Sequence, residues 1–260
     1  MILPHDASLR AQGRKPKVKA ITLLAATVIG IGCILLGERP ASAEWFADIY
    51  AGPTFTAHHD VTIDDRAVGR GRFLDVGFDT ALSFGGRVGL YFDAAPFVGL
   101  AVDYFQFYPN IGPQSVQLRG CFVVGGCVSG QGGTGSFDIT ERTISVDLML
   151  RLPLIKTADA PQGLVQPYIA VGLPLVITTI DPRNTRLFRN HNDATDLSFG
   201  AKAVGGLAVH VYKNLALFAE YRFNHVSTDV DLQDSVSAAK ATFRTDLNSH
   251  SALVGISARW

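Results

Sequence analysis

Two groups of residues have the types and spacing from which chemistry could be built. The first is His225-Val226-Ser227, which sets a base and a hydroxyl two positions apart, so that in a strand both would share a face. Histidine can act as base for a serine nucleophile when a third group orients the imidazole. No glutamate follows in the remaining chain to serve as that third group. We expect a histidine and a serine at the rim of a fold.

The second group is a set of charged residues that fall on the less apolar faces of alternating segments. Unpaired charge in a low-dielectric interior is costly, so these groups should pair across strands. We expect a salt-bridged plug that stiffens the fold. A gate that rearranges to pass small solutes is the alternative, and catalysis by paired carboxylates would need an access cleft that nothing in the sequence predicts. The set comprises Arg87, Asp103, Glu141, Asp147, Arg151, Lys202, Glu220 and Arg222.

Two further segments resemble binding motifs without matching one. His58-His59-Asp60, with Asp64 and Asp65, offers metal-binding groups, but the spacing fits no established site, so a solvated loop is expected. The glycine run at 125–135 lacks the Gly-Lys-Ser/Thr end of a phosphate loop. It is expected to be a flexible surface loop held by a Cys121–Cys127 disulfide. We therefore predict no catalytic residue, no metal site and no cofactor.

The secondary structure that positions these residues is constrained by the composition. The chain is apolar overall, yet its main part has no long apolar run. The 260 residues are 47% hydrophobic and 18% charged, with 26 glycines. After residue 43 no apolar run reaches the roughly 18 residues that a spanning helix needs. The near-zero net charge argues against nucleic-acid binding, which requires a basic face.

The first 43 residues have the order of a secretory signal peptide. Five basic residues precede an apolar stretch at 20–37, and Ala41-Ser42-Ala43 forms a small-residue cleavage site. An uncleaved anchor is the alternative. Removal of residues 1–43 leaves 17 basic and 21 acidic residues, a formal net charge of −4. It also leaves two cysteines, Cys121 and Cys127, and an even count in an exported chain favours one disulfide.

From residue 44 onward the hydrophobic period is two, which predicts strands. In 139–152, for example, Ile144, Val146 and Leu148 share one face, while Ser145 and Asp147 share the other. Eight such segments of about 11–15 residues suit tilted strands that cross a bilayer. They are expected near 46–57, 80–92, 97–108, 139–152, 165–179, 197–211, 215–227 and 249–260.

The polar faces hold many small residues beside isolated charges, which fits the crowded interior of a narrow barrel better than a solvated surface. The connections also differ in length. Short links at 93–96, 213–214 and 153–164 alternate with long ones at 58–79, 109–138, 180–196 and 228–248. Short turns at one end and four long surface loops at the other are typical of outer-membrane barrels. A soluble periplasmic β-protein is the main rival.

With these patterns, the segments FGGRVGLYF, ISVDLMLRLPL, QPYIAVGLPL and FAEYRF resemble the porin-like family of small outer-membrane barrels, related to outer-membrane protein A and opacity-protein barrels. The terminal SALVGISARW resembles the signal read by the barrel-assembly machinery, with Trp260 as its terminal aromatic. The resemblance implies an all-β, eight-stranded antiparallel up-and-down transmembrane barrel over 44–260, with a plugged or very narrow lumen.

The resemblance also implies a place and a role. We expect a monomer in the outer membrane of a Gram-negative cell, in contact with lipid and lipopolysaccharide and with a structural or surface-interaction function. An unidentified surface ligand would bind the loops. A narrow porin-like channel for small solutes is one alternative. The other is an enzyme similar to lipid A deacylases, which carry an H-x-S pair like His225 and Ser227, although Thr228-Asp229-Val230 departs from the sequence that follows the pair in that family.

Overall fold

The computed structural model describes residues 43–65, 69–123, 125–157, 162–181, 194–233 and 240–260. The predicted signal peptide, residues 1–43, lies outside the described residues except for Ala43. In the described ranges, no helix is long and apolar enough to cross a membrane.

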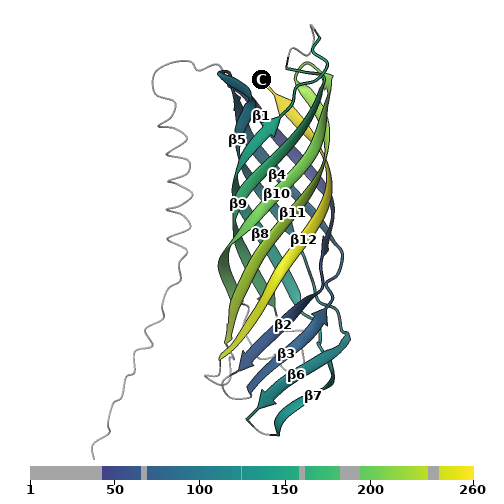
Figure 1. Cartoon of the computed structure of the whole chain (residues 1–260), viewed down its shortest axis with the longest axis vertical. Coiled ribbons are helices and arrows are strands. Elements are labelled where there is room, and N and C mark those ends of the chain that lie inside the picture. The colour runs from purple at the N-terminus through teal and green to yellow at the C-terminus, as the bar shows by residue number, and fades with distance from the viewer. Residues whose placement is uncertain (1–42, 66–68, 124, 158–161, 182–193, 234–239) are drawn as a thin grey trace, which may run out of the picture. The chain divides into compact units, whose positions relative to one another are not determined.

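Eight antiparallel strands close into a ring (Figure 1). Each strand pairs with its neighbour in the ring, and β1 pairs with β12, from Phe46 opposite Arg259 to Thr56 opposite Ser249, to complete it. The predicted eight-stranded up-and-down barrel is therefore confirmed. In ring order the strands are β1 (Ala43–Thr56), β4 (Ala81–Phe92), β5 (Ala95–Phe107), β8 (Asp138–Arg151), β9 (Val165–Asp181), β10 (Ala194–Tyr212), β11 (Leu215–Gln233) and β12 (Lys240–Arg259).

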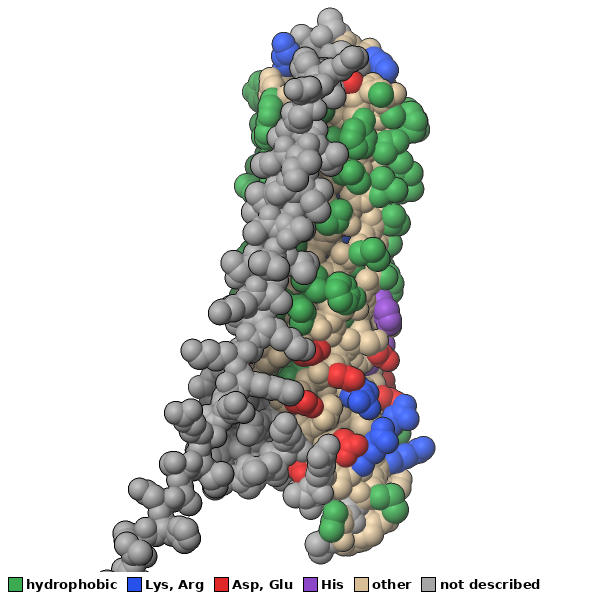
Figure 2. All heavy atoms as spheres, turned by 90° about the vertical axis from the view of Figure 1, so that its left-hand side faces the viewer, with side chains coloured by type: hydrophobic (Ala, Val, Ile, Leu, Met, Phe, Trp, Pro, Cys, Tyr) green, Lys and Arg blue, Asp and Glu red, His purple; other side chains and the backbone are tan. Residues whose placement is uncertain are grey.

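The alternation in the sequence becomes an inside and an outside. On β8, Val146 and Leu148 are 51% and 44% exposed, whereas Ser145 and Asp147 between and beside them are buried. Because successive side chains of a strand point to opposite faces, one closed sheet gives an apolar outer wall and a polar interior. Figure 2 shows hydrophobic side chains over the barrel wall and charged side chains gathered toward one end of it.

The two ends of the barrel differ. The end that carries Arg259 and the tight β4–β5 and β10–β11 turns is called the turn end here. Two backbone hydrogen bonds join Trp45 and Trp260 at this end. The N–H of Trp45 donates to the carbonyl oxygen of Trp260 at 2.9 Å, and the N–H of Trp260 donates to the carbonyl oxygen of Trp45 at 3.1 Å. Trp260 itself is 61% exposed.

At the opposite end the structure differs from the predicted loops. Segments 58–79 and 109–138 contain four more strands, β2 (His59–Asp65), β3 (Gly69–Val76), β6 (Ser115–Phe122) and β7 (Gly126–Gly133). They continue the sheet from β12 in the order β2, β3, β6, β7, and are called the extension here (Figure 1). The glycine run predicted to be a flexible loop is mostly strand β7. Strands β11 and β12 also run beyond the predicted 215–227 and 249–260.

The extension packs against the outer ends of the barrel strands through a shared apolar core. Val61, Ile63 and Phe243 are buried with Ile139 and Ile180 in one apolar cluster. The inward faces of β2 and of the outer part of β12 are apolar there, so burial outweighs the entropy of ordering these segments.

Candidate functional site

All eight charged residues predicted for the interior are buried within the ring, each less than 9% exposed. They come from five strands: Arg87 from β4, Asp103 from β5, Glu141, Asp147 and Arg151 from β8, Lys202 from β10, and Glu220 and Arg222 from β11. Among the described residues, seven of the eight lie in ion pairs and Glu141 does not.

The centre of the network joins opposite walls of the barrel. Lys202 Nζ lies 2.6 Å from Asp103 Oδ2 and also binds Asp147 and the Ser145 hydroxyl. Arg222 Nη2 lies 3.0 Å from the same Asp103 oxygen and 2.7 Å from Glu220 Oε1. Each cation thus contacts two carboxylates, which offsets the cost of removing these charges from water.

Arg87 extends the network toward the turn end. Its Nη2 lies 2.8 Å from Asp48 Oδ2 and 3.2 Å from Glu220 Oε2. Asp48 was missed in the sequence, although it lies inside the predicted strand 46–57 on the same face as Tyr50. The alternation that identified Arg87 would have identified it as well.

Two tyrosines complete the central layer. The Tyr50 hydroxyl donates to Asp103, and the Tyr168 hydroxyl donates to Glu220 Oε2 at 2.7 Å. Glycines make room for both rings: a Cβ added at Gly206 would lie 2.5 Å from the Tyr168 ring, and one added at Gly85 would lie 2.5 Å from the Tyr50 oxygen. Both rings are buried beside the ion pairs.

A second layer of charged residues lies at the turn end. Arg151 forms two hydrogen bonds to the Glu44 carboxylate, one from Nη1 at 2.8 Å. Arg259 Nη1 lies 3.3 Å from Glu44 and donates to Gln166 Oε1 at 2.6 Å. Glu44 precedes the first predicted strand, so the alternation could not identify it, whereas Arg259 lies on the last predicted strand.

Glu141 stands apart from both layers. Its backbone lies opposite Phe107 on one side and Thr178 on the other. The residue is 1% exposed, and no cation pairs with it among the described residues. Paired charges and aromatic rings thus lie in the interior of the ring in both layers.

His225 and Ser227 point outward, as predicted from the alternation, and both are exposed. His225 Nδ1 lies 2.6 Å from the side-chain oxygen of Asn248 on β12. An amide therefore holds the imidazole where a carboxylate would stand in a catalytic triad. Ser227 lies opposite Asp246 on the same neighbouring strand.

Ser227 also lines a groove of about 730 Å³ on the outer wall, between β10–β12 and the extension. Two of the loop residues predicted to be solvated, His58 and Asp60, have side-chain partners there. Arg72 Nη2 lies 2.6 Å from Asp60, and His58 Nδ1 lies 3.3 Å from Asp75. The backbone N–H of Asp75, with Arg72, holds the pKa of Asp60 below its usual value. In the described ranges no group of His, Cys, Asp and Glu could hold a metal ion.

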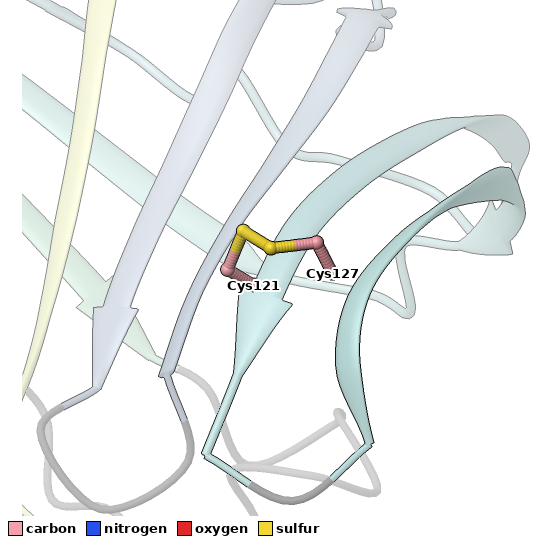
Figure 3. Close-up of a disulfide and its surroundings, with 2 residues drawn as sticks. All are labelled: Cys121 and Cys127. Atoms are coloured by element: carbon pink, nitrogen blue, oxygen red, sulfur yellow. A yellow bond between two sulfur atoms is a disulfide. The ribbon is translucent and has the colours of Figure 1, made fainter.

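The predicted disulfide is present. Cys121 on β6 and Cys127 on β7 lie directly opposite each other and are bonded (Figure 3). The bond links the two outermost strands of the extension near their connecting turn.

No protein-family model matches the sequence, and no curated protein matches it significantly. Solved structures of bacterial outer-membrane proteins are similar. Neisserial surface protein A is 15% identical over 84% of this chain and 99% of its own, with a TM-score of 0.46. OprG from Pseudomonas aeruginosa is 14% identical over 83% and 95%, with a TM-score of 0.49. The protease OmpT from Escherichia coli is 10% identical over 84% and 97%, with a TM-score of 0.44. At these values the fold assignment rests on the strand ring of this chain itself.

Proposed function

We propose that the chain is a bacterial outer-membrane barrel that anchors the extension at the cell surface, where the extension contacts other molecules. The observation that carries the proposal is the pairing of an apolar outer wall with a buried ionic interior. Leu82, Leu173 and Phe199 are at least 70% exposed on the wall, while Arg87 and Arg222 are at most 2% exposed inside. In water this arrangement would be inside out, whereas in lipid both faces are satisfied.

Two variants test the orientation, each with one cysteine added to a chain whose Cys121 and Cys127 are disulfide-bonded. Asp64 on β2 is exposed in the extension, and Asp93 is exposed in the β4–β5 turn at the other end. In intact cells a membrane-impermeant maleimide should label Asp64→Cys and leave Asp93→Cys unlabelled until the outer membrane is permeabilised. Equal labelling of both, or recovery of the chain in the soluble periplasmic fraction, would contradict the proposal.

The plug supports a closed barrel over the narrow channel that the sequence also allowed. A channel would need Lys202 or Arg222 to leave two carboxylates each, which exposes uncompensated buried charge. Purified protein in planar bilayers should therefore show no unitary conductance steps. Regular steps would favour the channel.

The contact between His225 and Asn248 favours a second candidate function, an enzymatic one. Asn248 can orient His225 through Nδ1 and leave Nε2 facing outward as a base, with Ser227 two residues along the same face. Loss of an acyl chain from lipopolysaccharide incubated with the purified protein, and its retention with Ser227→Ala, would support that activity. Unchanged lipid with both proteins would leave the anchoring role alone.

A further inference from the structure

Strand β7 forms a free edge of the sheet. The strand order ends at β7, and β6 is its one neighbour among the described strands (Figure 1). All eight residues of β6 pair in register with β7, from Ser115 opposite Gly133 to Phe122 opposite Gly126. The backbone N–H and C=O groups on the far side of β7 are therefore available to another strand.

The edge carries none of the features that usually block such pairing. Proteins protect exposed edges with charged side chains, prolines or bulges. The β7 sequence GCVSGQGG has no charge and no proline, and seven of its eight residues are exposed. No register shift interrupts its pairing with β6. The Cys121–Cys127 disulfide holds the two strands together, so the edge is presented by a braced hairpin.

The face of the extension next to this edge carries three arginines, one of which, Arg70, lies opposite Asp64 of β2. Arg72 on β3 lies opposite Arg119 on β6, and Arg70 is two residues away on the same face. Ion pairs tie Arg72 to Asp60, but none involves Arg70 or Arg119 among the described residues. Arg119 is exposed and lies opposite Ser129 of β7, whose small side chain leaves the face of β7 open between Arg119 and a strand added beyond it.

We propose that β7 receives an extended polypeptide segment with acidic side chains at alternate positions, which pairs as an added strand. This inference rests on the surface exposure proposed above and names the partner. Only an extended polypeptide backbone matches the spacing of donors and acceptors along the edge. Alternate acidic side chains of such a segment fall on the face that carries Arg119, which stands one strand in from the edge.

The test uses the full chain in detergent micelles and a fluorescent ten-residue peptide of alternating glutamate and threonine. Saturable binding is expected, and it should weaken about tenfold when alternate peptide nitrogens are methylated. Gln131→Pro, on β7, should weaken binding similarly, because residue 131 has the same parity as Cys127 and directs its N–H away from β6. Val123→Pro, in the adjoining turn, should not. Arg119→Gln should weaken the acidic peptide and leave a lysine–threonine peptide unaffected.

Four results would overturn the inference. The first three are no saturable binding up to about 1 mM peptide, equal binding of the methylated peptide, and equal binding of the lysine peptide. The fourth is a chain that sediments as a dimer in which a second copy already covers β7. If Asp64→Cys is labelled on intact cells while the peptide does not bind, the inference fails and the anchoring role stands. If labelling itself fails, the anchoring role fails.

Discussion

Lys202 on β10 and Asp103 on β5 meet across the lumen, with Nζ 2.6 Å from Oδ2, although β8 and β9 lie between their strands in the ring. A contact of this kind braces opposite walls of the barrel, and neither strand pairing nor the apolar belt requires it. The free energy of unfolding of the barrel should therefore depend on a few buried side chains such as Lys202 and Asp103.

Removing the cation should be costly. Lys202→Met leaves Asp147 as an unpaired buried charge, and we expect a loss of about 3–5 kcal/mol in the free energy of unfolding. Urea titration in micelles, followed by the gel mobility of unheated protein, measures it. The double variant Lys202→Met/Asp147→Asn should recover part of the loss. Lys213→Met, at the exposed β10–β11 turn, is the control, and a Lys202→Met midpoint equal to that control would contradict the bracing role.

The glycine beside Tyr168 should not tolerate a methyl group. A Cβ at Gly206 would lie 2.5 Å from the ring, so Gly206→Ala must displace Tyr168 from Glu220. Overpacking of this kind costs about 1–3 kcal/mol. Thermal unfolding measures the loss against Gly130→Ala, where nothing lies within 4 Å of the added atom. Equal melting temperatures for the two variants would show that the lumen is looser than described.

The disulfide should stabilise the extension and leave the barrel unaffected. Replacing Cys121 and Cys127 with serine removes a short cross-link. By lowering the entropy of the unfolded chain, this cross-link stabilises the folded state by about 2 kcal/mol. We expect faster hydrogen exchange in β6 and β7, with exchange in β8 and β9 unchanged. Faster exchange in the barrel strands would mean that the extension and the barrel unfold as one unit.

The β2–β3 hairpin should weaken in acid. The backbone N–H of Asp75 and the Arg72 guanidinium lower the pKa of Asp60 below its ordinary value of 3.8. The unfolded hairpin then binds a proton more readily, so the stabilisation is present above about pH 4 and is lost as pH falls through the folded pKa. Hydrogen exchange at the Asp75 amide should speed up in that window. In Asp60→Asn the acid dependence should disappear, and its persistence would assign the effect to another group.

The alternation of period two predicted the ring and the inward position of Lys202, because side-chain direction follows directly from the strand. It did not predict which charges pair, since partners such as Lys202 and Asp103 are set by register and by reach across the lumen. The extension was missed for a different reason. Strand β7 buries neither face, so its sequence carries no alternation, and its pairing depends on the neighbouring hairpin and on Cys127.

The central claim, an apolar wall that faces lipid, is tested most directly by spin labels on Val146→Cys and Asp229→Cys in lipid vesicles. Val146 lies on the outer wall of β8 and is 51% exposed. Asp229 lies on the part of β11 whose outer face is charged, where it pairs with Arg244. The label at residue 146 should be accessible to oxygen and shielded from a water-soluble nickel chelate, with the reverse at residue 229. Access of the chelate to both labels would contradict a membrane-spanning barrel.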